Sequence, residues 1–367
     1  MAASLQILVN LALLGFFPAS AIAWGILIRR RIKRYKRLGI FGPLVPPVPR
    51  PNPFWTPLAF LVLMGCFLIV SPLLQLGFAA LGVIEMPTRP PADAAATPQP
   101  ATGFQDSAEL ALGTMVFVIS CLLTCVYLYL LAPKRFGELG LRPTARGVRL
   151  GLIASLLTLP PLMLMMAGVS WLVPYEHKVL DVLADEPSLI KFGVLFIATA
   201  IITPIVEEFT IRVVLQGSLQ GWADRGYRQP DGNAQPDEED VAAESVRHTS
   251  DEAPVTDGDS PAQPTGVAWA YRASLDDSGR VAVPPETSAP ESGSAKRADW
   301  PVLITSLLFA MLHFGQGLAP VPLFFLSLVL GYLYRQTGNI TASVVVHMVL
   351  NSITMIVSFV AVAAGGE

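Results

Sequence analysis

Two adjacent carboxylates, Glu207 and Glu208, and a guanidinium, Arg212, stand where the apolar run LIKFGVLFIATAII ends. Residues four apart share a face of a helix, so Glu208 and Arg212 can form an ion pair. Glu207 points about 100° away and lacks that partner. One carboxylate would then be held by the guanidinium, and the other becomes a candidate general base for a water molecule. The alternative is a helix end at the membrane surface, where all three charges are simply solvated.

Two further apolar runs contain polar residues at the same spacing. His313 follows Phe309 by four residues in SLLFAMLHFGQG, and Asn351 follows His347 by four residues in VVVHMVLN. Each pair therefore shares one helix face. A single histidine in an apolar run is usually a core residue, but two histidines, an asparagine and a spare glutamate favour a functional site. They can form one site only if the three helices pack together.

The composition predicts the elements that must position these residues. Only 14% of the residues are charged and 52% are hydrophobic, whereas a soluble protein has about 25% charged residues. The apolar runs are much longer than strands, so we expect transmembrane helices. The predicted fold is all-α, a polytopic bundle with about eight spans. The apolar runs lie at about 5–28, 55–85, 108–132, 150–173, 189–209, 300–316, 318–334 and 340–363.

The charges between the runs predict the topology. Seven of the nine residues in RRRIKRYKR, at 29–37, are basic, and they follow the first apolar run. Basic residues favour the cytoplasmic side, which places the N-terminus outside, and alternation places the C-terminus outside as well. Residues 224–298 contain 15 acidic and 7 basic residues and few large apolar ones. This composition predicts a disordered acidic insert at 223–299, located in the cytoplasm.

Three parts follow from this division of the chain. Residues 1–149 are predicted to form N-terminal membrane helices, about three spans with basic cytosolic loops. Residues 150–222 and 300–367 are predicted to form the membrane core that carries the candidate site residues, and 223–299 the insert that divides it. One difficulty concerns depth, because His313 comes 13 residues after Trp300, roughly 20 Å along a helix.

The three motifs together resemble a known family. EEFTIR at 207–212, FAMLH at 309–313 and HMVLN at 347–351 match Glu-Glu-x-x-x-Arg, Phe-x-x-x-His and His-x-x-x-Asn. In this order on separate membrane helices, they resemble the CPBP family of intramembrane proteases. That family includes the type II CAAX prenyl endopeptidases and bacterial relatives linked to bacteriocin processing. Two features depart from its pattern: Ile211 and Val213 flank Arg212 where Phe-Arg-Gly is common, and a long insert separates the first two motifs.

The resemblance implies an intramembrane endopeptidase that hydrolyses a peptide bond of a membrane-associated substrate near the cytoplasmic face. By matching position, Glu207 would activate the water and His313 would help to hold it. Glu208 and Arg212 would form the supporting ion pair. His347 and Asn351 would hold the water and stabilise the oxyanion, as an acyl-transfer intermediate requires.

The residue types leave the cofactor open between none and one Zn²⁺. Glu207, His313 and His347 would be the ligands if a metal is bound, since two histidines and a carboxylate with an open position can hold catalytic zinc. The histidines do not share one helix as in His-Glu-x-x-His, which favours a metal-free mechanism.

Other functions fit the same residues. A non-catalytic scaffold, or an immunity or sensing protein, could keep the pocket, and a transporter could use Glu207 and the histidines as a proton relay. We expect a peptide or protein substrate and the lipid bilayer as partners, and no nucleic acid. The expected location is a bacterial cytoplasmic membrane.

Overall fold

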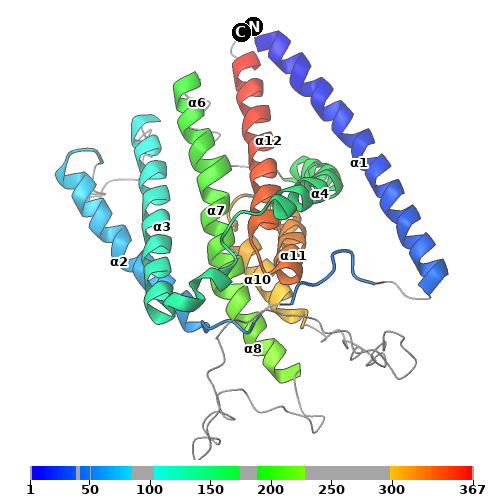
Figure 1. Ribbon diagram of the computed structural model, residues 1–367. Helices are drawn as coiled ribbons and strands as arrows, with labels where there is room; N and C mark the ends of the chain where they lie inside the picture. The colour runs from blue at the N-terminus through cyan, green and yellow to red at the C-terminus, as the bar shows by residue number, and fades with distance from the viewer. Residues whose placement is uncertain are drawn as a thin grey trace, which may run out of the picture. The chain divides into compact units, whose positions relative to one another are not determined.

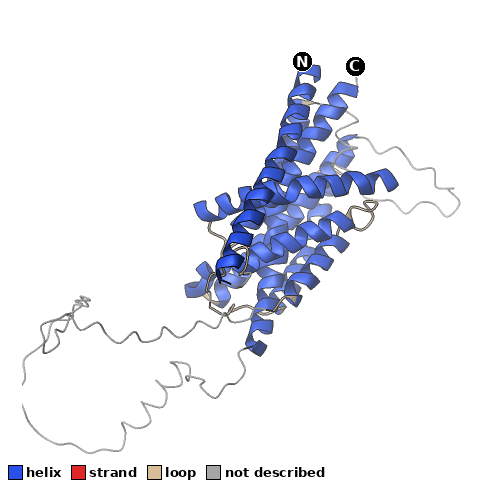
Figure 2. Cartoon of the chain, turned by 90° about the vertical axis from the view of Figure 1, so that its right-hand side faces the viewer, coloured by secondary structure: helices blue, strands red, loops and turns tan. Residues whose placement is uncertain are grey.

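The protein is entirely helical in the part that the structure describes (Figures 1 and 2). The structure is a computed structural model that describes residues 2–38, 42–49, 51–84, 103–173, 188–227 and 298–365. No strand occurs within these ranges, so the prediction of an all-α fold is confirmed. The predicted insert at 223–299 lies outside the described residues apart from its two ends.

Each predicted apolar run coincides with a helix. The elements are α1 (Ala2–Leu38), α2 (Leu58–Ala80), α3 (Gly103–Leu131), η1 (Pro133–Leu139), α4 (Ala145–Leu172), α6 (Leu189–Phe196), η2 (Ile197–Ile202), α7 (Thr203–Glu208), η3 (Phe209–Gln216), α8 (Gly217–Tyr227), α10 (Trp300–Met311), α11 (Pro320–Thr337) and α12 (Thr341–Gly365). Six of these helical stretches, within the described ranges, are long and apolar enough to cross a membrane. Their outward faces carry exposed apolar side chains such as Leu61, Leu68 and Ile69, as expected for surfaces in lipid. The protein is therefore an integral membrane protein.

Helices α10 and α11 form a shorter hairpin. Helix α10 has only 12 residues, about 18 Å, compared with a hydrocarbon core of about 30 Å. It packs against α11, and the connection contains Gly315 and Gly317 with φ of 102° and 60°. Glycine adopts this left-handed region without the steric cost of a Cβ atom, so the chain can reverse sharply. His313 lies in this reversal, just after α10 ends.

One continuous helical stretch, from α6 to α8, contains two π-helical segments. The segments η2 and η3 are π-helices on either side of α7. Pro204 lies in the first turn of α7 and has no N–H to donate, and its ring crowds the preceding turn. The wide turn of η2 relieves that conflict, because the Thr203 N–H donates to the Ala198 carbonyl five residues back. π-turns inside α-helices are frequent at functional sites, and here they flank Glu207 and Glu208.

Small residues let α4 and α12 approach closely. A Cβ atom added at Gly151 would lie 2.6 Å from Val345 Cβ and 2.9 Å from the Ala342 carbonyl oxygen. One added at Gly147 would lie 2.7 Å from Thr341 Cβ. Glycines four residues apart are a common device for close packing of membrane helices. This contact fixes the first two turns of α12, which lead directly to His347.

A hydrogen-bond network joins the two ends of the segment between α8 and α10. Chain contacts divide the protein into one unit of Met1–Asp224 with Ala298–Glu367 and another of Arg225–Arg297. Within the first unit, the Ala298 N–H donates to Asp224 Oδ1 at 3.2 Å. Gln220 Nε2 donates to the same carboxylate at 2.7 Å and to the Ala298 carbonyl at 3.1 Å. The end of α8 is therefore fastened to the start of α10.

We expect Gly151→Ala to destabilise the protein by about 1–3 kcal/mol, because the added methyl group overpacks the contact with α12. Gly168→Ala in the same helix is the matched control, since nothing lies within 4 Å of its added Cβ atom. Thermal unfolding in detergent should show a lower midpoint for the first variant and an unchanged or higher midpoint for the second. Equal midpoints would contradict the close contact.

Candidate active site

Arg212 lies at the centre of a buried polar cluster. Its side chain is fully buried, and its Nε donates to Glu208 Oε2 at 3.2 Å. Its other nitrogens reach neutral acceptors on three elements: Ser327 Oγ at 2.6 Å, Gln216 Oε1 at 3.3 Å and Thr305 Oγ1 at 3.4 Å. A buried ion pair is tolerated when further hydrogen bonds satisfy its remaining donors. These contacts join η3, α10 and α11 around one charge.

His347 connects the two carboxylates. Its Nδ1 lies 3.3 Å from Glu208 Oε1, and its Nε2 lies 3.6 Å from Glu207 Oε2. The imidazole is almost completely buried, with 3% of the residue exposed. Glu208 therefore contacts both Arg212 and His347, so one carboxylate orients the guanidinium on one side and the imidazole on the other.

Glu207 differs from Glu208 in its surroundings. The Glu207 side chain is 17% exposed, whereas that of Glu208 is 0% exposed. Of the two, Glu207 lines a cavity of about 690 Å³, and Glu208 lies behind the cavity wall. The structure thus gives the neighbouring glutamates different positions, one in an ion pair and one facing open space.

Four of the predicted site residues line this single cavity: Glu207, His313, His347 and Asn351. They come from α7, the α10–α11 reversal and α12. Phe309 is buried behind them, with its ring centroid 5.0 Å from that of His313 and 5.6 Å from that of His347. The Arg212 guanidinium carbon lies 5.8 Å from the same ring centroid. Phe309 therefore packs against both histidines and near the guanidinium.

Hydrogen bonds to backbone carbonyls orient two of the cavity residues. His313 Nδ1 lies 2.9 Å from the Phe309 carbonyl oxygen, which leaves Nε2 for other contacts. Asn351 Nδ2 donates to the Thr199 carbonyl at 2.9 Å, and Thr199 belongs to the π-turn η2. An amide group has two hydrogens on that nitrogen, so one donor remains for another partner.

The positions of α10 and of the helical stretch from α6 to α8 explain how His313 reaches the level of Glu207. The start of α10 is bonded to Asp224, which lies 17 residues beyond Glu207 (224 − 207), about 26 Å along a helix. Helix α10 thus begins well beyond the glutamates and returns to their level at His313. His347, by contrast, lies six residues into α12 (347 − 341), about 9 Å from its start.

Sequence reasoning missed several polar residues of the cavity, among them Lys191 and Gln316. The Gln316 Oε1 atom is buried without a hydrogen-bond partner in the part of the chain that the structure describes. The flanking Gly315 and Gly317 could have indicated a reversal that presents the side chain between them. Lys191 could have been found as the lone charged residue in LIKFGVLFIATAII.

The side-chain positions do not form a recognisable metal site. Among the described residues, no group of three or more His, Cys, Asp and Glu side chains is arranged to hold a metal ion. His347 has a carboxylate oxygen near each ring nitrogen, and His313 Nδ1 faces a backbone carbonyl. Histidines that bind a metal commonly have such partners on their second ring nitrogen, so zinc at Glu207, His313 and His347 stays a prediction, and we derive no step through a metal.

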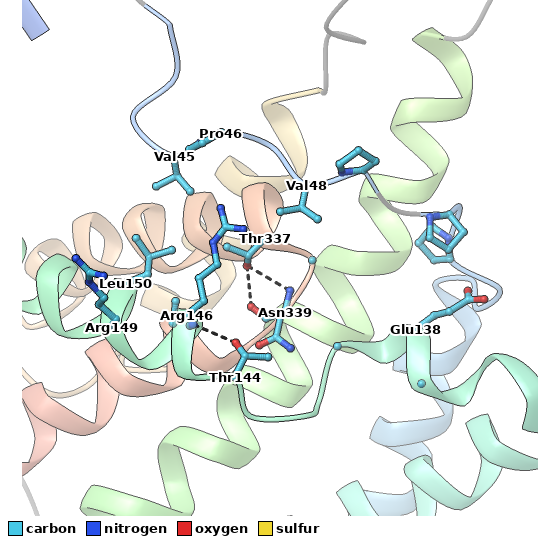
Figure 3. A pocket seen from close by; sticks show the side chains of 18 of the residues that line it. Val45, Pro46, Val48, Glu138, Thr144, Arg146, Arg149, Leu150, Thr337 and Asn339 are labelled. Carbon is cyan, nitrogen blue, oxygen red and sulfur yellow. Dashed lines mark hydrogen bonds between the residues drawn. The ribbon is translucent and has the colours of Figure 1, made fainter. Parts of the chain in front are cut away.

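A second cavity of about 680 Å³ lies at the start of α4 (Figure 3). Its walls include Val45, Pro46 and Val48 of the segment before α2, together with Arg146 and Arg149. Its carboxylate, Glu138, accepts a hydrogen bond from Arg135 Nη2 at 2.9 Å, and this bond raises the pKa of Arg135. Among the described residues, no histidine lines it. The candidate active site is therefore the cavity at Glu207.

The fold and the site define a polytopic helical membrane protein with carboxylate and imidazole groups around an internal cavity. Residues 288–353 match the Rce1-like family, described as type II CAAX prenyl endopeptidase Rce1-like. The match confirms the predicted resemblance to CAAX-type intramembrane proteases over this range. It contains Phe309, His313, His347 and Asn351, whereas the Glu-Glu-x-x-x-Arg motif precedes it. No curated protein and no solved structure matches the chain.

We expect Glu208→Gln to destabilise the protein by about 3–5 kcal/mol, because it leaves the buried guanidinium of Arg212 without its carboxylate. Glu207→Gln is the matched control, since that side chain faces the cavity and has no guanidinium partner in the described structure. Thermal unfolding in detergent should separate the two variants clearly. Similar losses of thermal stability in both variants would contradict the assignment of Glu208 to the ion pair and of Glu207 to the cavity.

Proposed function

We propose that the protein is an intramembrane endopeptidase that cleaves a membrane-associated peptide. The observation that supports this most directly is the cavity, where Glu207 is the single lining carboxylate among the described residues and lies beside two histidines and an asparagine. The family match at 288–353 supports a protease of the CAAX type in general. A carboxylate next to hydrogen-bonding side chains in a low-dielectric cavity suits general-base activation of water.

The proposed reaction begins at Glu207. Its carboxylate accepts a proton from a water molecule as the water oxygen attacks the peptide carbonyl carbon. His313, with Nδ1 at the Phe309 carbonyl, presents Nε2 to hold that water. Glu207 then donates the same proton to the nitrogen of the leaving amine as the C–N bond breaks. The overall reaction adds one water molecule across the peptide bond.

The oxyanion formed by this attack needs hydrogen-bond donors where its charge develops. In the proposal, the free N–H of the Asn351 amide supplies one donor. The Nε2–H of His347 supplies the other, with the imidazole protonated at both nitrogens because Nδ1–H donates to Glu208. Glu208 acts as a positioning residue, because it fixes Nδ1 of His347 while Arg212 fixes Glu208. The buried ion pair therefore contributes through the orientation of His347.

The substrate is proposed to be a peptide held in or at the bilayer, cut toward the end of the bundle with the basic loops. His347 supports this position, since it lies about 9 Å from the start of α12, and the Asn339 side chain before that helix donates to the Arg142 carbonyl of a basic loop. We propose a bacterial cytoplasmic membrane as the location, with that end facing the cytoplasm.

Glu207→Gln is expected to lower the rate of peptide cleavage at least about 100-fold, because an amide cannot accept the proton from water. The assay uses the full chain in proteoliposomes with a library of membrane-tethered peptides, and products are identified by mass spectrometry. Glu138→Gln, the same change outside this cavity, should retain wild-type activity. Equal cleavage by wild type and Glu207→Gln would reject the proposal.

Because the proposed mechanism uses side chains alone, cleavage should continue at an unchanged rate after dialysis against EDTA. Metal analysis of the dialysed protein provides the control that any bound zinc has been removed. Loss of activity that zinc restores would instead assign the reaction to a metal held by Glu207, His313 and His347.

A further inference from the structure

Lys191 places a cation in the wall of the candidate active-site cavity. It lies in the first turn of α6, where its backbone N–H donates to Ser188 Oγ at 3.1 Å. Its ammonium group has no carboxylate partner among the described residues. A cation is disfavoured near a helix N-terminus, where the helix dipole is positive. Lys191 faces the cavity, and an ionisable residue of a membrane helix that faces a cavity often marks a functional site.

The cavity follows one face of the helix from Lys191 to Glu207. Lining residues recur along α6, η2 and α7 without a gap longer than one turn: Lys191, Val194, Ala198, Ile202, Thr203 and Glu207. The two charged ends are 16 residues apart (207 − 191), about 24 Å along a helix. The site is thus elongated, with a general-base candidate at one end and a cation at the other.

The peptide bond that Glu207 reaches must lie in an extended segment, because a helix engages each carbonyl oxygen in its own backbone hydrogen bond. An extended chain advances about 3.3–3.6 Å per residue. Allowing for the reach of the lysine side chain, about five to seven extended residues connect the ammonium group to Glu207.

We infer that Lys191 is a specificity-determining residue that binds a substrate carboxylate about five to seven residues from the scissile bond. The position relative to a scissile bond rests on the proposed function, whereas binding of the carboxylate by Lys191 can be measured without cleavage. The carboxylate can belong to an acidic side chain or to the C-terminus of the peptide. Both sources present the same group to the ammonium.

The first experiment measures binding by Glu207→Gln protein, which separates recognition from hydrolysis. Fluorescence anisotropy in detergent compares labelled apolar ten-residue peptides that end in a free carboxylate, in an amide, or in an amide with one internal glutamate. We expect about tenfold tighter binding of either carboxylate-bearing peptide than of the neutral one, as for a hydrogen bond to a charged group. The two carboxylate arms distinguish a C-terminal from a side-chain source.

Charge reversal tests the assignment to this residue. Adding Lys191→Glu to the Glu207→Gln protein should abolish the preference and favour a peptide with lysine in place of glutamate, whereas Lys191→Arg should retain it. Lys134→Glu, an exposed reversal in η1, should leave all affinities unchanged, and thermal unfolding verifies that each variant is folded. A preference that persists in Lys191→Glu would overturn the inference, as would tighter binding of a simple anionic lipid than of both carboxylate peptides.

Cleavage then separates this inference from the proposed function. Wild-type protein is assayed on peptides in which one glutamate is moved stepwise away from the cleaved bond, and the rate should peak at a spacing of five to seven residues. Cleavage that ignores glutamate position would refute the role of Lys191 and leave the protease intact. Charge-dependent binding without any cleavage would retain the role of Lys191 and reject the protease.

Discussion

A buried guanidinium requires a full set of acceptors, and the arrangement of the core helices follows from that requirement at Arg212. Acceptors come from the same helical stretch, through Glu208 and Gln216, and from α10 and α11, through Thr305 and Ser327. Glu208 extends the network to His347 on α12. Displacing any of these helices would leave a polar group unpaired in a low-dielectric environment, which is costly. The polar cluster therefore fixes the relative positions of the helices that carry the cavity residues.

The local winding of the chain determines how that cluster meets the cavity. Adjacent glutamates in a helix point in different directions, so one can enter the buried network while the other faces open space. The π-turn η2 also places the Thr199 carbonyl where Asn351 reaches it. The short helix α10 brings His313 back to the level of Glu207. The π-turn η2 and the short helix α10 thus both contribute to one site.

Much of the fold was predictable because long apolar runs in a membrane protein must be helices. The spacing of four residues indicated the pairing of Glu208 with Arg212. The three motifs indicated which helices pack together to form the site. The two π-turns were not predictable, since the hydrophobic pattern does not report a change from i+4 to i+5 hydrogen bonding. Nor were Thr305 and Ser327, whose hydroxyl groups are unremarkable in apolar runs until tertiary packing places them against Arg212.

The fastening of Asp224 and Gln220 to Ala298 has a consequence for how such a chain can diversify. These hydrogen bonds hold the end of α8 next to the start of α10. Any chain that connects the two helices therefore starts and finishes at nearly the same point. Closing a longer loop between fixed ends adds little entropy cost. The sequence between these two helices can therefore be lengthened, shortened or exchanged without displacing the residues of the cavity in the bilayer.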